Sequence, residues 1–262
     1  MIKGGKEMIL DKFSLKGKVA IVTGATGGLG RGITLALSEA GADLVLVSRT
    51  LSSLKIVAKE IENLDRQVLI ISANVTKKEE VNLVIEKTLE KFGKIDILVN
   101  GAGITHRSII EDFPEELWDE VIDTNLKGAF LFSQAAGKVM IKQNKGKIIN
   151  IVSLLSVIGG EFCPAYAASK GGLSQLTKAL AVAWAQYNIN INAIGPGYFK
   201  TSMTKAIYED EVRNNKILSR IPMRRWGKPE EDLSGAVIYL ASEASNYVNG
   251  QTIYVDGGWL AY

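Results

Sequence analysis

The chain has 262 residues, of which 47% are hydrophobic and 23% charged, and its formal net charge is +3 at pH 7. This balance predicts a soluble globular domain over residues 1–262, and the absence of a basic run excludes a nucleic-acid partner. Cys163 and His106 are the only residues of their kinds, which excludes an internal disulfide and a Cys/His zinc site, so we expect no metal. The charged first residues and the lack of a membrane-length apolar stretch predict a cytoplasmic protein without a membrane partner.

Seven short apolar runs alternate with stretches of helical periodicity, which is the pattern of a parallel sheet covered by helices on both faces. The runs are almost continuously apolar, as strands buried on both faces must be. The predicted strands are Val19–Thr23, Leu44–Ser48, Val68–Ser72, Ile95–Asn100, Lys147–Val152, Ile189–Ile194 and Thr252–Val255. The sequence therefore predicts an α/β fold with a doubly wound sheet.

Helices are expected between these strands. Apolar residues spaced from Val81 to Phe92 predict one helix, and Thr76 with Glu79 predicts a capping box at its start. A second helix is expected to begin near Pro114, because proline and acidic residues favour a first turn. Residues 195–228 show no clear periodicity. We interpret them as a lid over the site, the alternative being a pair of short structural helices.

The first predicted strand runs into a glycine-rich turn, which a helix to Ala40 follows. Glycines at this place let the backbone approach a pyrophosphate, whose charge is stabilised by the helix N-terminus. The alternative is a tight turn that only packs strand against helix. The residues expected to bind the cofactor here are Gly24, Thr26, Gly27, Gly28, Leu29 and Gly30.

The end of the second strand predicts which cofactor is used. An NAD-dependent enzyme usually has an acidic residue there, whereas this chain has Ser48 and Arg49. Arg49 can pair with a 2′-phosphate, and Ser48 can add a hydrogen bond, so we expect NADP in preference to NAD. The alternative for Arg49 is a solvated surface residue.

Tyr166 and Lys170 are four residues apart near the start of a predicted helix from Ala165 to about Tyr187, so they share one face. Ser153 follows the fifth strand, where carboxyl ends of strands face a cleft. Tyrosine is a poor base at neutral pH, but the ammonium of Lys170 and an oxidised nicotinamide would lower its pKa. Tyr166 then exchanges a proton with a substrate oxygen that Ser153 holds.

In order and interval, these segments resemble the short-chain dehydrogenase/reductase family along essentially the whole chain. The matching segments are Thr23–Gly30, Asn100–Gly103, Thr124–Gly128, Ser153, Tyr166 with Lys170, and Pro196-Gly197 with Thr201. The resemblance implies a seven-stranded Rossmann-type sheet of order 3-2-1-4-5-6-7 and an enzyme that transfers a hydride at a CH–OH group. It also implies that Asn125 joins Ser153, Tyr166 and Lys170 in catalysis by holding a water that links Lys170 to solvent.

The same resemblance implies further cofactor contacts. They are Asn74, Val75, Asn100, Ala102, Gly103, Pro196, Gly197, Phe199 and Thr201, together with Tyr166 and Lys170. Two positions depart from the family pattern. Asn74 stands where the family often has Asp beside the adenine, and Gly101 replaces a second Asn in the turn after the fourth strand.

Several segments outside the common core resemble one branch of this family, the sugar-acid dehydrogenases, so we expect the pair D-gluconate and 5-keto-D-gluconate as substrates. Arg107 is the expected partner of the substrate carboxylate, with Ser153 and Tyr166 at the reacting carbon; the alternative is a surface arginine. Two other functions stay open: a 3-oxoacyl-thioester reductase acting with acyl carrier protein, and a non-catalytic dinucleotide sensor.

A homotetramer is expected, because two predicted helices carry more apolar residues than one sheet face needs. These residues are Leu173, Leu176, Leu180 and Trp184 on the helix from Ala165, and Phe130, Phe132 and Val139 on the helix before it. The C-terminal residues Trp259 to Tyr262 are also expected to pack on a neighbouring subunit.

Overall fold

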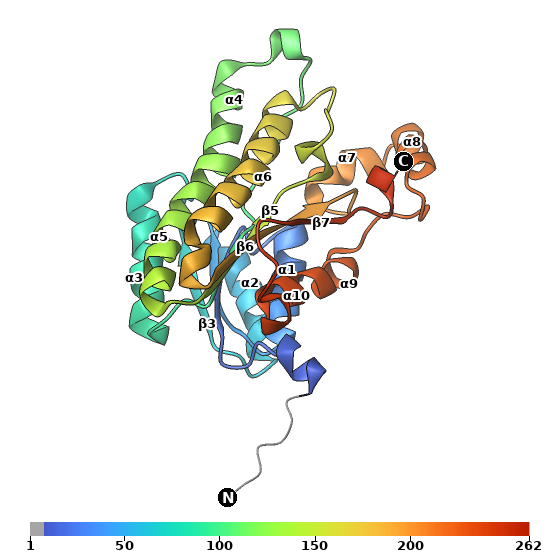
Figure 1. Ribbon diagram of the computed structural model, residues 1–262. Helices are drawn as coiled ribbons and strands as arrows, with labels where there is room; N and C mark the ends of the chain where they lie inside the picture. Colours follow the sequence, from blue (N-terminus) through green and yellow to red (C-terminus); the bar gives the residue numbers. More distant parts are fainter. Residues whose placement is uncertain (1–7, 262) are drawn as a thin grey trace, which may run out of the picture.

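A computed structural model describes residues 8–261. Seven parallel strands form one sheet in the order β3-β2-β1-β4-β5-β6-β7 (Figure 1), which confirms the expected topology. The strands are β1 (Val19–Thr23), β2 (Asp43–Ser48), β3 (Val68–Ser72), β4 (Ile97–Asn100), β5 (Gly146–Ile151), β6 (Ile189–Pro196) and β7 (Thr252–Val255). Each predicted strand is present, with ends that differ by at most two residues.

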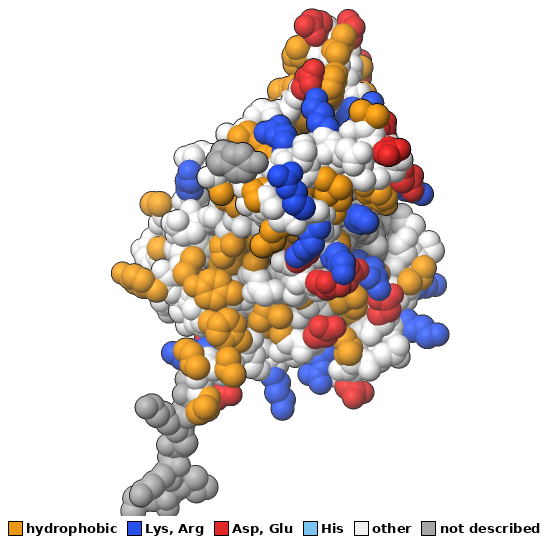
Figure 2. Space-filling model, turned by 90° about the vertical axis from the view of Figure 1, so that its right-hand side faces the viewer, with side chains coloured by type: hydrophobic (Ala, Val, Ile, Leu, Met, Phe, Trp, Pro, Cys, Tyr) orange, Lys and Arg blue, Asp and Glu red, His pale blue; other side chains and the backbone are white. Residues whose placement is uncertain are grey.

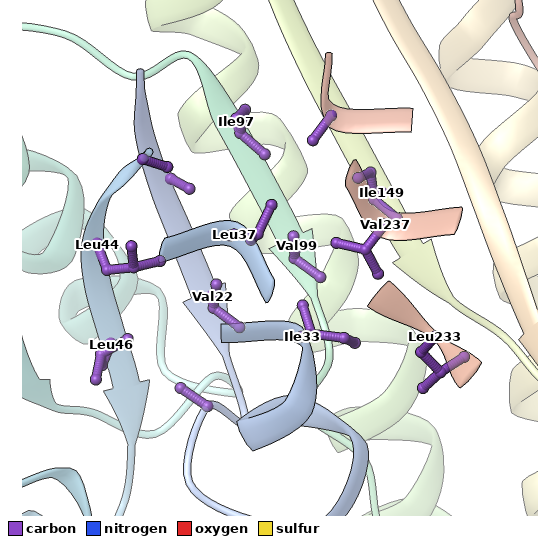
Figure 3. Packing of buried hydrophobic residues seen from close by; sticks show 14 of the residues in the cluster. Val22, Ile33, Leu37, Leu44, Leu46, Ile97, Val99, Ile149, Leu233 and Val237 are labelled. Atoms are coloured by element: carbon purple, nitrogen blue, oxygen red, sulfur yellow. The ribbon is translucent and has the colours of Figure 1, made fainter. Parts of the chain in front are cut away.

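Helices cover both faces of this sheet, and each face has its own apolar core. On one face lie α1 (Gly28–Glu39), α2 (Leu51–Glu62), α9 (Pro229–Asp232) and α10 (Ser234–Ala241). Figure 3 shows Ile33 and Leu37 of α1 and Val237 of α10 packed on β-strand residues such as Val22 and Val99. On the other face lie α3 (Lys78–Phe92), α5 (Gly128–Gln143) and α6 (Pro164–Trp184). Carboxyl ends of β4, β5 and β6 consequently lie beside the start of α6.

The start of α3 differs from the prediction. Its N-cap is Lys77, and no side chain caps the helix. The hydroxyl of Thr76 instead donates to Asn74 Oδ1 at 3.1 Å, and Glu80, not Glu79, accepts from the backbone N–H of Asn74 at 2.7 Å. The predicted capping box was wrong because the Asn74 side chain competes for the Thr76 hydroxyl, a local alternative typical of Asn.

Residues 195–228 are not irregular. After β6 they form α7 (Lys205–Tyr208) and α8 (Glu211–Arg220), and Trp226 packs edge-on against Tyr198 and Tyr208, with ring centroids 5.6 and 5.8 Å apart. Arg225 fastens the end of the segment to Asp232 through two hydrogen bonds of 2.6 and 2.7 Å. Short helices are therefore present, and movement of this segment as a lid stays a prediction.

Some residues predicted for subunit contacts belong to the core of this chain. Leu173 and Phe132 are 1% and 0% exposed. The Trp184 ring lies so close to Gly137 of α5 that a β-carbon there would overlap it. These side chains are therefore used by the packing of α5 and α6 on their own sheet, and the prediction that they form surplus surface was wrong.

The C-terminal residues also pack within the chain. Trp259 is 5% exposed, its ring lies 4.7 Å from that of Tyr198, and the Arg220 guanidinium stacks on it at 4.2 Å. The expectation that Trp259 needs a neighbouring subunit was therefore wrong, because the segment after β6 covers it. Tyr262 lies outside the described residues.

Candidate active site

Tyr166 and Lys170 lie in the first two turns of α6, which begins at Pro164. Their four-residue spacing places the Lys170 ammonium 5.6 Å from the centre of the Tyr166 ring. Lys170 Nζ also donates a 2.6 Å hydrogen bond to the carbonyl of Ile151, the last residue of β5. Ser153 follows two residues later, and its hydroxyl is close enough to the Tyr166 phenol to lower the pKa of that group. The structure thus brings the three predicted residues together at the carboxyl end of β5.

The pKa of Tyr166 lies above its usual value in the chain alone. Burial of the phenol raises its pKa to about 12, and the neighbouring Ser153 hydroxyl lowers it by less. That Lys170 and an oxidised nicotinamide together lower this pKa stays a prediction for the cofactor complex. Burial also lowers the pKa of Lys170 itself, to about 8, because desolvation disfavours its charged form. In the chain alone, desolvation of the phenol is the larger effect.

Asn125 lies in a π-helical segment, Asp123–Lys127, between α4 (Glu115–Ile122) and α5. Its amide bonds both backbone groups of Ile104, at 2.8 and 2.9 Å, and donates to Ser169 Oγ at 3.0 Å. Gly103 lies beside it: a β-carbon there would be 3.3 Å from Asn125 Oδ1 and 3.5 Å from Lys170 Nζ. The side chains of Asn125 and Lys170 therefore both approach Gly103, and a side chain at this position would crowd them.

The glycine turn has two kinds of glycine. Gly24 has φ +68° and touches the backbone of Ala102, so neither its conformation nor its surroundings admits a side chain. Gly27 has no such neighbour, and a β-carbon there would extend into open space. Gly27 is also the N-cap of α1, and no side chain caps that helix. The turn thus leaves open space beside the backbone N–H groups at the start of α1, where no side chain caps the helix. A pyrophosphate can bind at such a helix N-terminus.

The end of β2 lies beside this turn. Thr26 donates a 3.1 Å hydrogen bond to Ser48 Oγ. Arg49 is exposed and forms no ion pair with any residue between 8 and 261. A free guanidinium with a neighbouring hydroxyl fits a phosphate, so these residues are able to hold the 2′-phosphate of NADP.

Other predicted cofactor residues turn partly inward. Val75 is 8% exposed and packs against Gly128. Asn100 is 3% exposed, and its Nδ2 donates to Ser133 and Asn150, so only its backbone is placed to meet a cofactor.

Thr23 was not among the predicted cofactor contacts. Its hydroxyl accepts from the backbone N–H groups of Gly101 and Ala102. Its position at the head of the glycine turn was the available signal.

The segment after β6 approaches the glycine turn. The Thr201 side chain lies 3.1 Å from the point where a β-carbon of Gly28 would be. Phe199 is 4% exposed and packs on Gly227, so its ring belongs to the core and only its backbone faces outward. Gly197 is tied to β7 through the carbonyl of Val255. Thr201 is thus the residue of this segment whose side chain reaches the candidate cofactor site.

Arg107 is exposed on the loop after β4. Its charge lowers the pKa of both Cys163 and Tyr198, although burial of each group has the larger, raising effect. Arg107 forms no ion pair within the described chain, whereas His106 bonds Glu120 at 2.9 Å. A free guanidinium therefore lies near the start of α6.

Tyr198, which follows β6, was not predicted to belong to the site, yet it lies close enough to Arg107 for the charge to lower its pKa.

Within residues 8–261, no cluster of three or more His, Cys, Asp and Glu side chains is suited to a metal ion. In the same part of the chain, no helix has both the length and the apolar character that crossing a membrane requires.

Comparisons with known proteins agree with this geometry. A sequence model of the family described as enoyl-(acyl carrier protein) reductase matches residues 24–260. The chain is 48% identical over 255 residues to 2-dehydro-3-deoxy-D-gluconate 5-dehydrogenase of Escherichia coli, covering 97% of this chain and 100% of the relative. It is 40% identical over 250 residues to 5-keto-D-gluconate 5-reductase of the same organism, covering 95% and 98%. Among solved structures, gluconate 5-dehydrogenase of Burkholderia cenocepacia in complex with NADP and tartrate superposes with a TM-score of 0.94 at 36% identity, covering 97% of this chain and 100% of that one.

Proposed function

This chain belongs to the short-chain dehydrogenase/reductase family, and from that premise we propose that it is an NADP(H)-dependent oxidoreductase acting on a secondary alcohol or ketone of a six-carbon sugar acid. The observation that carries the proposal is the convergence of Ser153, Tyr166 and Lys170 at the carboxyl end of β5. The nicotinamide cofactor, when bound, supplies or accepts the hydride.

In the proposed mechanism, Ser153 holds the substrate oxygen and Tyr166 exchanges a proton with it. A Tyr166 pKa of about 12 keeps the phenol protonated at neutral pH, ready to donate to a carbonyl oxygen. The Lys170 ammonium lies beside the phenol and favours the phenolate when the proton moves in the opposite direction. Asn125 holds the Ile104 segment beside Lys170.

For the cofactor, we propose that the amides at the start of α1 bind the pyrophosphate and that Ser48 and Arg49 bind the 2′-phosphate. The unpaired Arg49 and the open space at Gly27 support this assignment. Asn74, Val75, Asn100, Ala102, Gly103, Pro196, Gly197, Phe199 and Thr201 would complete the site, several of them through their backbones. The NADP complex named for the Burkholderia relative also supports it.

For the substrate, we propose reaction at C5, the position that the names of both Escherichia coli relatives share. The higher identity, 48% against 40%, makes 2-dehydro-3-deoxy-D-gluconate the first substrate to test, ahead of D-gluconate and 5-keto-D-gluconate. Arg107 would bind the carboxylate through its planar fork. On the side of the molecule with α7, α8 and α10 (Figure 2), Lys and Arg side chains are interspersed with acidic ones, so this side is not uniformly basic toward an acidic carrier protein.

The test follows NAD(P)H absorbance, which falls when a ketone is reduced and rises when an alcohol is oxidised with NAD(P)+, using the purified protein and a panel of substrates. We expect turnover of the three sugar acids to exceed that of neutral sugars and of 3-oxoacyl and enoyl thioesters. Better turnover of a thioester would favour the acyl-reductase function, to which the matching family description points. Cofactor binding without turnover of any substrate would favour the sensor.

For assembly and location, we propose a cytoplasmic homotetramer. Exposed apolar side chains on the paired helices α5 and α6 support association: Phe130 is 40% and Val182 83% exposed. Because β7 ends the sheet, one strand edge is also open to a second copy. Sedimentation velocity at micromolar concentration tests this, and a monomer would contradict it.

A further inference from the structure

Four buried polar side chains form a row on the face of the sheet that α5 and α6 cover. Asn100 ends β4, and Asn150 is its register partner in β5. Ser133 belongs to α5 and Thr177 to α6. All four are between 0 and 3% exposed. Burying a polar group lowers the stability of the folded protein unless the group is hydrogen-bonded. The hydrogen bonds within this row therefore decide whether these four residues stabilise or destabilise the fold.

The row is joined by hydrogen bonds. Asn100 Nδ2 donates to Ser133 Oγ at 2.9 Å and to Asn150 Oδ1 at 2.8 Å. Asn150 Nδ2 donates to Thr177 Oγ1 at 2.9 Å, and the Thr177 hydroxyl donates to the carbonyl of Leu173 at 2.8 Å. Two strands and two helices are thereby connected through side chains that cannot exchange these bonds for water.

This row lies directly beneath the candidate active site. Ile151, which accepts the hydrogen bond of Lys170, is the next residue after Asn150. Thr177 lies seven residues after Lys170, two helical turns along the same face of α6. The helix is therefore bound to β5 at two consecutive strand residues, by Thr177 and by Lys170. Two such bonds set the position of α6 along the strand.

We propose that Asn150 and Thr177 are positioning residues that fix α6 along β5, so that Tyr166 and Lys170 stay beside Ser153. The proposal rests on the proposed function of those three residues. Without the bond from Asn150 to Thr177, Lys170 makes the remaining side-chain hydrogen bond between α6 and β5 among residues 8–261, and apolar packing alone permits a small shift of the helix along the strand. A shift of about 1 Å between reacting groups can lower a rate by about 100-fold.

The test compares Thr177→Val, Thr177→Ser and Thr88→Val. Valine keeps the volume of Thr177 but removes both hydrogen bonds, whereas serine keeps them. Thr88 is a matched control, because it is equally buried and its hydroxyl donates to the Val84 carbonyl at 2.7 Å within α3, away from the site. We expect Thr177→Val to lower kcat at least about tenfold, with KM for substrate and cofactor changed less than about twofold. Thr177→Ser and Thr88→Val should stay near the wild-type kcat.

A wild-type kcat in folded Thr177→Val, an equal fall in Thr88→Val, or no recovery in Thr177→Ser would each overturn the proposal. If Thr177→Val does not fold, Thr177→Cys, which loses the methyl group as serine does and has a thiol that bonds more weakly than a hydroxyl, should show the same fall to a smaller degree relative to Thr177→Ser. Tyr166→Phe in the same assay separates the two proposals. An active Tyr166→Phe refutes the proposed function, whereas an inactive one beside a fully active Thr177→Val refutes only the positioning role.

Discussion

The two halves of the sheet present different surfaces at their carboxyl ends. Around β1 and β2, the candidate cofactor residues are open: Gly27 borders free space, and Arg49 is exposed and unpaired in the described chain. Around β4 and β5, the candidate catalytic residues are fixed by short hydrogen bonds, and Asn125 and Lys170 are 0 and 4% exposed. A ligand bound by charge tolerates small displacements, whereas proton transfer requires fixed geometry. Substitutions in the two halves should therefore have effects of different size.

The largest effect is expected from Tyr166→Phe, in the fixed half. Loss of the hydroxyl should lower kcat about 1,000-fold or more. Among the described residues of the site, Ser153 holds the substrate oxygen and Tyr166 is the group assigned to exchange the proton with it. The dissociation constant of the cofactor should stay near the wild-type value. Steady-state kinetics and cofactor fluorescence measure the two quantities, and Tyr187→Phe, in the 3-10 turn that follows the end of α6, is the control. Residual activity above a few per cent would refute the mechanism.

Arg107→Ala should have the next largest effect. Because Arg107 is exposed in the chain alone, we expect the loss in kcat/KM for a sugar acid to be about 30-fold, or about 2 kcal/mol. A neutral polyol of equal length should lose much less, since it has no carboxylate to pair. The control is Arg66→Ala, on the loop before β3. Equal losses for acid and polyol would show that Arg107 does not bind the carboxylate.

Arg49→Asp tests the open half. An acidic residue repels a 2′-phosphate and accepts hydrogen bonds from ribose hydroxyls, so the preference for NADP(H) should flatten or reverse. We expect the ratio of kcat/KM for the two cofactors to change by about tenfold, and by less at high salt because the residue is exposed. A wild-type enzyme that prefers NAD(H) would contradict the assignment of Arg49.

The smallest effect concerns stability and a lysine outside the site. Lys147, near the amino end of β5, is 6% exposed, and burial lowers its pKa to about 8. Between pH 8 and the unfolded pKa of 10.5, the unfolded chain binds the proton and the folded chain does not, so the free energy of unfolding rises with pH. We expect Lys147→Met to remove about 1 kcal/mol of this rise between pH 8 and 9.5.

Urea unfolding of the wild-type protein and of Lys147→Met between pH 8 and 9.5 measures this difference in the free energy of unfolding. Burial lowers the pKa of Lys170 as well, so Lys170 also makes the free energy of unfolding rise with pH. Lys147→Met should therefore reduce the slope of the free energy of unfolding against pH without abolishing it. Kinetic constants should be unchanged, because Lys147 bonds Asn190 and Ser245 and touches none of the candidate catalytic residues. An identical slope in the two proteins would show that Lys147 does not titrate in this range.

Periodicity predicted every strand, because strands buried on both faces need apolar residues at each position. It failed where a side chain competes with the backbone, as Asn74 does for Thr76. The strand predicted from Ile95 begins at Ile97, and both backbone groups of Ile95 are bonded by the Gln143 side chain instead of by a neighbouring strand. Such long-range bonds have no local pattern in the sequence.

Motif spacing placed Ser153, Tyr166 and Lys170 in one site, because each lies at a defined position on its strand or helix. The direction of the Tyr166 pKa shift was not predictable in this way, since it depends on how deeply the phenol is buried. Nor was the inward direction of Asn100, which follows from its register with Asn150. The depth at which a side chain is buried and the register between two strands are set only when the sheet is assembled. The pattern of residues along the chain therefore does not predict them directly.

The strand order also bears on how the protein is made. β1 lies in the interior of the sheet, yet β4, its neighbour on one side, follows it only after α1, β2, α2, β3 and α3. On the ribosome, the β3-β2-β1 portion can therefore assemble while one edge of β1 still lacks its partner. Chains of this kind depend on late, long-range pairing, which slows folding and exposes strand edges. Until β4 emerges, the nascent half that carries the glycine turn is the part of this protein most open to misassembly.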